Sequence, residues 1–481
     1  MCMDLGTIGV FSFRLRSSLQ ITMTDSKQEL AHKPIGPLLR KYSAPPMVAL
    51  FVHALYNVMD SIFVGQGPGT LALAALAICF PIQMTIMAAG MGMGVGTASV
   101  VSRALGARDQ RLAERAAGTS FTVTGVIALL VNVLGLMFLE PLLELFGATE
   151  SVLPYAKDYL SIVLYGSVFV GIAVSSSNVA RAEGSVRIAM AIMILGAMVN
   201  LILDPIFIFG LDMGIRGAAI ATVIANMCSF TCYCAYFIFG KSMLKITRRD
   251  LIPDINVLPE VLKIGSVSFL SMVAGNLMAI PINGVIGAYG QDVHFAIMGI
   301  INRSMMFFFM PIYGLVQGLQ PIIGFNYGAQ DYKRVIKAVR KATLYASVLS
   351  ALAFCLLMVA AESVLGIFSS DAELIGEGAS IMRIVILVMP FVGVQMVGGS
   401  LFLALGKARP GFILTLSRQV FLLLPLVFIL PRFFGLEGLW AAFPLADTVA
   451  FLMTATWVRF EMRALGRRSQ ASMELKEGRA T

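Results

Sequence analysis

Apolar stretches long enough to cross a lipid bilayer recur along almost the whole chain, and this pattern limits the fold more than any other feature. A helix needs about 20 apolar residues to span the hydrocarbon core. Hydrophobic residues make up 58% of the 481 residues and charged residues only 13%, whereas soluble proteins carry about 25% charged residues. The chain is therefore predicted to be an all-α polytopic membrane protein.

Charged and turn-rich breaks divide the apolar stretches into twelve candidate transmembrane helices. The predicted spans are 45–65, 71–101, 117–140, 157–180, 188–210, 214–239, 262–289, 294–325, 338–361, 378–405, 410–431 and 435–459. Lys and Arg gather in alternate loops, which by the positive-inside rule makes these loops and both termini cytoplasmic. We expect a multi-pass protein of the inner (plasma) membrane, surrounded by lipid. The net charge of +9 is explained by the loops, so no nucleic-acid partner is expected.

The second half of the chain repeats the first. Gly106-Ala107-Arg108-Asp109 recurs as Gly328-Ala329-Gln330-Asp331, and Gly184-Ser-Val-Arg187 recurs as Gly406-Lys-Ala-Arg409, each at a spacing of 222 (328 − 106, 406 − 184). Six spans per half give the two copies the same orientation, so an axis along the membrane normal should relate them. The fold class predicted is two parallel-related lobes of six helices.

This repeat sets the expected domain organisation. It comprises a cytoplasmic extension 1–40, a first six-helix lobe 41–239, a basic cytoplasmic linker 240–262, a second lobe 263–460 and a cytoplasmic tail 461–481. Met23 opens a polar segment that resembles an ordinary cytosolic start, so translation is hypothesised to begin there.

Three carboxylates lie inside predicted spans, where charged groups are costly and are functional candidates by default. They are Asp60, Asp204 and Asp447, of which Asp447 is the weakest candidate. Asn200 shares a helix face with Asp204, and Thr222 is expected at a similar depth. The set Asp60, Asn200, Asp204 and Thr222 supplies hard oxygen ligands for a small cation, or a site for a proton shared by two carboxylates. The alternative is a group of hydrogen bonds that only holds helices together.

Other polar residues are weaker candidates. Asn57 and His53 precede Asp60 on the first span and are secondary candidates for cation or proton coupling. The candidates for a substrate cavity are Tyr56, Gln83, Met278, Asn283 and Gln395. The abundant Met and Phe suit an adaptable cavity, and they suit ordinary packing equally.

The sequence offers little for nucleotide or enzyme chemistry. Gly90-x-Gly92-x-Gly94-x-Gly96 lacks the spacing of a dinucleotide fingerprint and lies inside a span, where it indicates close helix packing or flexing of the helix. No Walker motif is present. We expect neither an enzyme nor a cofactor, and a coupling ion in place of ATP.

Several stretches together resemble the multidrug and toxic compound extrusion (MATE) family. They are Tyr56-Asn-Val-Met-Asp60-Ser-Ile-Phe-Val-Gly65, Asn200-Leu-Ile-Leu-Asp204-Pro, Gly214-Ile-Arg-Gly217-Ala-Ala-Ile-Ala-Thr222 and Gly318-Leu-Gln-Pro321-Ile-Ile-Gly324-Phe-Asn326-Tyr-Gly328. The resemblance covers about residues 40 to 460. It implies a V-shaped pair of lobes and drug/cation antiport, with the coupling Na⁺ or H⁺ bound in the N-terminal lobe at positions that match Asp60, Asn200, Asp204 and Thr222. Spans seven, eight and ten contain no Asp or Glu, unlike the NorM-type pattern, so the chain is more similar to the DinF- and MepA-like bacterial branch.

The function expected is secondary active multidrug efflux, in which organic, mainly cationic compounds leave in exchange for Na⁺ or H⁺. Two alternatives stay open. A lipid-linked precursor flippase would add basic residues to the cavity, for which Arg303 is the candidate. A non-transporting receptor or scaffold would leave the buried carboxylates unexplained. Six helices per lobe need no partner chain, so a monomer is expected.

Overall fold

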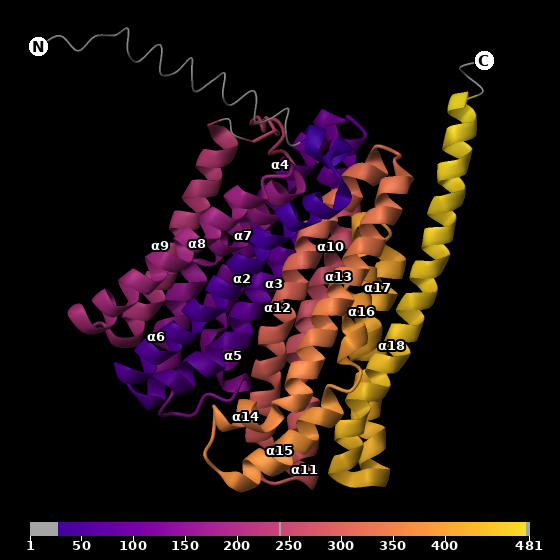
Figure 1. Ribbon diagram of the computed structural model, residues 1–481. Helices are drawn as coiled ribbons and strands as arrows, with labels where there is room; N and C mark the ends of the chain where they lie inside the picture. The colour runs from indigo at the N-terminus through magenta and orange to yellow at the C-terminus, as the bar shows by residue number, and fades with distance from the viewer. Residues whose placement is uncertain (1–26, 240–241, 478–481) are drawn as a thin grey trace, which may run out of the picture.

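The computed structural model describes residues 27–239 and 242–477. The hypothesised start at Met23 and the loop residue Lys241 lie outside these residues. Every regular element in the described part is helical (Figure 1). After a short helix over 27–32, the elements of the first half are α2 Ile35–Gln66, α3 Thr70–Gly106, α4 Gln110–Met137, α5 Leu139–Leu145, α6 Leu153–Tyr165, α7 Ser167–Ala182, α8 Val186–Pro205, η1 Ile206–Gly210 and α9 Gly214–Ile238. Those of the second half are α10 Leu258–Leu277, α11 Ala279–Tyr289, α12 Asp292–Gly328, α13 Tyr332–Val359, α14 Ala361–Gly366, α15 Ala372–Val385, α16 Met389–Ala404, α17 Ala408–Leu416, η2 Ser417–Leu423 and α18 Leu424–Glu477.

The described helices account for the twelve predicted spans. Nine helical units are long and apolar enough to cross a membrane by themselves, and two further spans are bent pairs, α6 with α7 at 53° and α15 with α16 at 46°. One of the nine units, Ala408–Ala471, contains two spans, because Gly435 breaks it with φ 57° and ψ −140°. Nine, two and one make twelve, which confirms the predicted count.

Helix breaks follow the same spacing as the sequence repeat. Phe138 separates α4 from α5, and Ala360 separates α13 from α14. Gly166 lies at the bend between α6 and α7, and Val388 at the bend between α15 and α16. Both pairs are 222 residues apart (360 − 138, 388 − 166), so the repeat seen in the sequence is also a repeat of helix geometry.

The repeated Gly-Ala-x-Asp motif forms the same turn twice. Asp109 accepts a hydrogen bond from the amide of Leu112 at 3.0 Å and caps α4, as Asp331 does for α13 through the amide of Arg334 at 3.0 Å. Such capping satisfies an amide that the first helical turn leaves without a partner. Arg108 precedes the first cap with φ 63°. Each motif therefore ends one long helix and begins the next.

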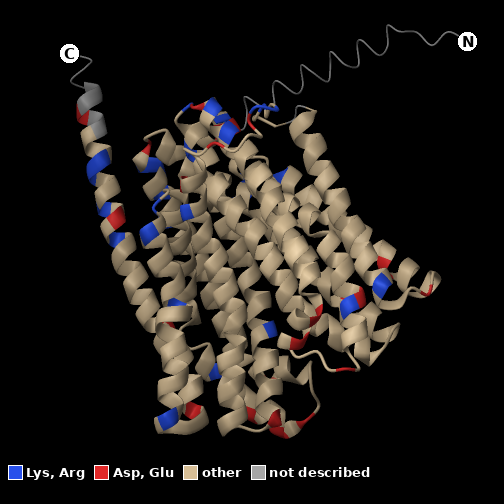
Figure 2. Cartoon of the chain, turned by 180° about the vertical axis from the view of Figure 1, so that it is seen from behind, with Lys and Arg blue, Asp and Glu red and all other residues tan. Residues whose placement is uncertain are grey.

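The two halves form two lobes that meet at one end of the bundle and diverge toward the other (Figure 1). Most Lys and Arg residues lie at the end where α2 begins and α18 finishes, which we call the basic end (Figure 2). The first membrane-spanning helix, α2, begins at Ile35, earlier than the predicted span 45–65, because Leu38 and Leu39 are fully buried in the core. It therefore crosses position 41, where the sequence placed the start of the first lobe.

Four glycines of α3 allow close packing at this junction. A Cβ on Gly90 or Gly94 would lie within 3.0 Å of α7 atoms, at Gly171 and Asn178, and one on Gly92 or Gly96 would lie within 3.0 Å of α10 atoms. Alternate glycines therefore face the two neighbouring helices, one in each lobe. This geometry confirms that the glycine motif serves close helix packing.

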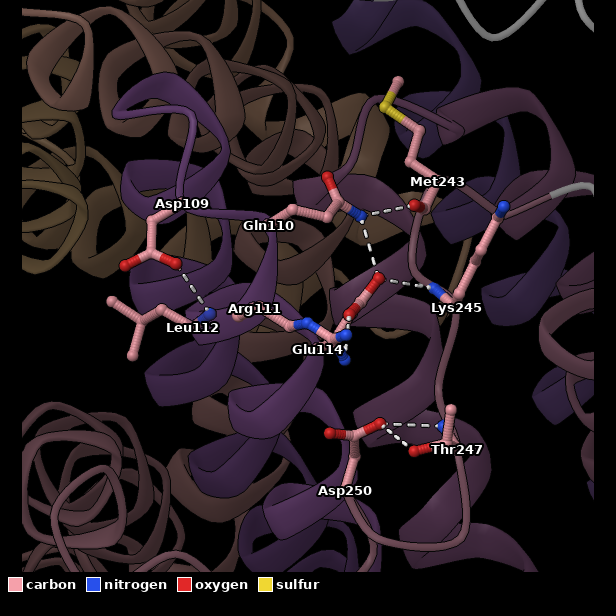
Figure 3. A network of polar contacts seen from close by, with 9 residues as sticks. All are labelled: Asp109, Gln110, Arg111, Leu112, Glu114, Met243, Lys245, Thr247 and Asp250. Atoms are coloured by element: carbon pink, nitrogen blue, oxygen red, sulfur yellow. Dashed lines mark hydrogen bonds and ion pairs between the residues drawn. The ribbon is translucent and has the colours of Figure 1, made fainter.

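The segment between the lobes lies against the first lobe at the basic end (Figure 3). Glu114 of α4, 5% exposed, accepts hydrogen bonds from Gln110 Nε2 at 3.2 Å and from the Lys245 amide at 3.1 Å. Asp250 accepts hydrogen bonds from the amide and the hydroxyl of Thr247 at 2.8 and 2.6 Å. Glu114 therefore attaches the described part of the linker to the first lobe, and Asp250 holds a turn within the linker itself.

Candidate functional site

Three helices of the first lobe bring the predicted polar residues together. Asn200 of α8 donates hydrogen bonds through Nδ2 to Asp204 Oδ1 at 3.2 Å and to Thr222 Oγ1 of α9 at 3.4 Å. Asp60 of α2 lines the same cavity as Asn200 and Thr222, and its carboxylate lies close to that of Asp204. The depth argument made from the sequence thus leads to one cluster, which we call the carboxylate cluster: Asp60, Asn200, Asp204 and Thr222.

Oxygen atoms of the carboxylate cluster lack donors. Asp204 is fully buried and Asn200 is 2% exposed. Among the described residues, Asp60 Oδ1, Asp204 Oδ2 and Asn200 Oδ1 are buried without any hydrogen-bond partner. Buried acceptors normally find a donor, and two adjacent carboxylates repel each other unless positive charge lies between them. The donor set fits a proton or a small hard cation such as Na⁺.

The backbone around Pro205 shapes one wall of this site. Proline has no N–H to continue the α-helical pattern, and α8 ends there in the π-helical turn η1. The end of α2 packs against that turn, since a Cβ on Gly67 would lie 2.6 Å from the Ile208 side chain. The turn therefore holds the end of α2, six residues after Asp60, next to the end of α8.

The weaker candidates near Asp60 face the same cavity with their polar groups partly engaged. Asn57 Nδ2 donates a hydrogen bond to the His53 carbonyl oxygen at 2.7 Å, within α2. The rings of His53 and Tyr56 are 4.8 Å apart in an edge-to-face contact. All three line the cavity next to Asp60, but none makes a described hydrogen bond to the carboxylate cluster.

The cavity has a volume of about 320 Å³ and lies mainly within the first lobe. Tyr56 and Gln83 of the predicted substrate-cavity residues line it, and Gln83 Nε2 donates a hydrogen bond to the Tyr159 hydroxyl at 3.0 Å. The other three lie elsewhere. Met278 is buried in the core of the second lobe, Asn283 is exposed, and Gln395 donates a hydrogen bond to the Asp447 carbonyl oxygen.

Asp447 does not belong to the carboxylate cluster. It lies in α18 of the second lobe, 3% exposed, and forms an ion pair with Arg418 of η2. Arg418 lies inside the predicted span 410–431 and was not among the predicted site residues. The rule that charges within spans need partners is the signal that would have found this pair.

The cavity also contains polar residues that the sequence analysis did not single out. Tyr159, Asn178 and Arg181 line it from α6 and α7, and Gln317 reaches it from α12 of the second lobe. Arg181 lies one residue beyond the predicted span 157–180, at a position expected in a loop. Arg303, named as the candidate basic cavity residue, is exposed and does not line the cavity.

Comparisons with known proteins agree on one family. A family profile described as MatE matches residues 45–206 and again 268–429, the two halves of the repeat. The chain is 27% identical over 423 residues to the multidrug export protein MepA of Staphylococcus haemolyticus. This alignment covers 88% of this chain and 92% of that protein. It is 41% identical to the MATE multidrug transporter DinF-BH, solved in complex with R6G, with a TM-score of 0.84 over 89% of this chain and 96% of the other. A multidrug resistance MATE family transporter of the MOP superfamily, solved in an outward-facing conformation, is 26% identical with a TM-score of 0.85, over 91% of this chain and 98% of the other.

Proposed function

We propose that this chain, which belongs to the MatE family, is a secondary multidrug exporter of the inner membrane that exchanges organic compounds for H⁺ or Na⁺. Its relatives include proteins named for multidrug export, and the described helices make it an integral membrane protein. The basic end is proposed to face the cytoplasm, and its excess of Lys and Arg supports this orientation (Figure 2). The chain is proposed to act as a monomer, with cationic compounds among its substrates.

The carboxylate cluster is the observation that carries ion coupling. Asp60, Asp204 and Asn200 each present a buried oxygen without a donor. A cluster that only held helices together would be expected to supply hydrogen-bond donors to these oxygen atoms, because an unsatisfied buried polar group costs about 1–3 kcal/mol. A proton or Na⁺ arriving at the site supplies the missing positive charge. The coupling ion here is cargo that binds and leaves in each cycle.

The position of the carboxylate cluster links the ion to the shape of the lobe. Asp60 lies on α2, which packs on α8 near Asp204 and on α12 of the second lobe, where Ser43 Oγ donates a hydrogen bond to the Leu315 carbonyl oxygen at 3.3 Å. An ion that draws Asp60 and Asp204 together therefore acts on a helix that also contacts the other lobe. Exchange requires the ion and the drug to favour different conformations of the protein, because a ligand that binds both conformations equally does not shift the equilibrium between them.

Reconstituted vesicles test this proposal. Dye movement is measured under an imposed pH gradient and, separately, an imposed Na⁺ gradient, for the unmodified chain and for Asp204→Asn. We expect movement under at least one gradient and its loss in the variant. Asp158→Asn is the matched control, because the Asp158 carboxylate pairs with Arg216 at 2.7 Å and does not line the cavity. Movement under neither gradient contradicts efflux, and full movement in Asp204→Asn contradicts the role of the carboxylate cluster.

A further inference from the structure

A positively charged group lies at the end of the cavity that is farthest from the carboxylate cluster. Arg181 is in the last turn of α7 at the basic end, and it lines the main cavity together with Asn178 and Gln317. Arg181 also lines a smaller cavity that continues toward α12, with Gln317 and Gln320. Arg181 comes from the first lobe and the two glutamines come from the second. The group therefore lies where the lobes meet.

The Arg181 guanidinium has no acidic partner among the described residues. Nη1 donates a hydrogen bond to Ser177 Oγ at 2.6 Å, and Nη2 donates one to Asn178 Oδ1 at 2.9 Å. A guanidinium has five N–H groups, so three are left without a described acceptor. Glu183, two residues away, is occupied by hydrogen bonds from Tyr236 and Ser242.

A guanidinium without an acidic partner favours the binding of an anion. A charge away from bulk water is costly unless it is paired, and a guanidinium matches the two oxygens of a carboxylate. The side-chain amide of Gln317 also makes no hydrogen bond within the described part of the chain, although it faces the same cavity. Its N–H groups are available to the same ligand from the second lobe. Asp60 is the one acidic residue among the described residues that line the main cavity, and it belongs to the carboxylate cluster.

Distance separates the two charged parts of the cavity. Tyr233 of α9 lines the same cavity and lies near Arg181, and it is eleven residues from Thr222 of the carboxylate cluster (233 − 222). At 1.5 Å per residue this is roughly 17 Å along the helix. A coupling ion at Asp60 and Asp204 therefore neither occupies nor neutralises the site at Arg181.

We propose that Arg181, assisted by Gln317, is an anion subsite of the drug cavity that holds the carboxylate of amphoteric organic substrates. This inference rests on the proposed export function and extends its substrates beyond simple cations. A compound with both an amine and a carboxylate would place the carboxylate at the junction of the lobes and its aromatic body in the apolar cavity. A compound without an anionic group would use the cavity but not Arg181.

A matched pair of xanthene dyes tests the subsite. The ethyl ester rhodamine 6G is a cation, and its free acid differs by carrying a carboxylate. Transport of each is measured in phosphatidylcholine vesicles, so that no anionic lipid occupies the site, for the unmodified chain, Arg181→Gln and Arg181→Lys. We expect Arg181→Gln to raise the acid-to-ester ratio of KM about tenfold, as loss of one charge-assisted pair predicts, and Arg181→Lys to raise it less.

Two further variants keep the test decisive. Arg303→Gln is the matched control, since Arg303 is exposed and outside the cavity lining, and its ratio should stay at the unmodified value. Gln317→Leu changes the other lobe, and it should raise the ratio a few-fold even if Arg181→Gln does not fold. An unchanged ratio in both cavity variants overturns the subsite while ester transport still upholds export. No transport of the ester by the unmodified chain overturns the export function itself.

Discussion

The backbones of Gly92 in α3 and Gly265 in α10 are in direct contact across the junction between the lobes. A Cβ on Gly265 would lie 2.4 Å from the Gly92 carbonyl oxygen, closer than a Cβ atom can approach. The obstacle is backbone, so no flexible side chain can move aside. The closed junction at the basic end therefore depends on the absence of a side chain at position 265.

Gly265→Ala should open this junction. We expect a loss of stability of about 1–3 kcal/mol, as is usual for overpacking, and slower dye efflux. Thermal unfolding measures the loss of stability, and dye movement in vesicles measures efflux. The distance between spin labels on the basic ends of α3 and α10 measures the opening of the junction. Gly299→Ala in α12 is the control, because a Cβ there meets no atom within 4 Å. Equal effects of the two substitutions would show that the contact at Gly92 is unimportant.

The hydroxyl of Thr222 should matter for ion binding, and that of Thr231 should not. Both residues are in α9, but Thr222 Oγ1 accepts a hydrogen bond from Asn200, whereas Thr231 Oγ1 donates one to the Met227 carbonyl oxygen within its own helix at 2.8 Å. Thr222→Val keeps the shape and removes one oxygen ligand. We expect a several-fold higher ion concentration for half-maximal efflux in Thr222→Val and an unchanged value in Thr231→Val. The same value in all three proteins would exclude the hydroxyl as a ligand.

The repeat and the carboxylate cluster could be predicted from the sequence because both depend on position along helices. A spacing of 222 residues recurs in the helix breaks as well as in the motifs, and counting residues along each span placed Asp60, Asp204 and Thr222 at one depth. These quantities follow from the fixed rise of a helix. They require no knowledge of which helices are neighbours.

The positions of the remaining site residues depend on how the helices rotate and bend. Counting residues along a span gives no information about either. Gln395 and Met278 lie in spans of suitable depth, but their helices turn these side chains toward the core of the second lobe. Arg181 lies just beyond the end of the predicted span 157–180, where residue counts alone predict a loop residue. The bend of 53° between α6 and α7 and the rotation of α7 place it in the cavity.

The ion pair between Asp447 and Arg418 should stabilise the second lobe without taking part in coupling. Asp447 is 3% exposed, and Asp447→Asn leaves the Arg418 charge without its partner. We expect a loss of about 2 kcal/mol, below the usual cost for a fully buried pair because the Arg418 side chain is 28% exposed. Thermal unfolding of Asp447→Asn, Arg418→Met and the double variant completes a double-mutant cycle, which gives the interaction energy of the ion pair.

The double variant should regain much of the stability, because both charges are then absent. Efflux by the double variant should keep the ion dependence of the unmodified chain. Loss of ion dependence would instead make Asp447 a coupling residue, the weaker role that the sequence suggested for it.

Contact between the linker and the first lobe should weaken as the pH rises. Glu183 follows α7 and is fully buried, and burial raises its pKa to about 7, although hydrogen bonds from Tyr236, Ser242 and the Met243 amide favour its charged form. A carboxyl whose folded pKa lies above its ordinary value of 4.5 contributes stability below pH 4.5. That contribution is lost as the pH rises through about 7. Ionised Glu183 therefore favours release of the segment that carries Ser242 and Met243.

Limited trypsin digestion at Arg248 and Arg249, both exposed in the linker, measures this release. The protease itself responds to pH, so the rate for the unmodified chain is divided by that for Glu183→Gln at the same pH. We expect this ratio to be several-fold higher at pH 8 than at pH 6, since the glutamine cannot ionise. Glu114→Gln provides a second comparison, because Glu114 binds the linker at a separate point, through the Lys245 amide. A ratio that stays constant from pH 6 to pH 8 would show that Glu183 does not control the linker.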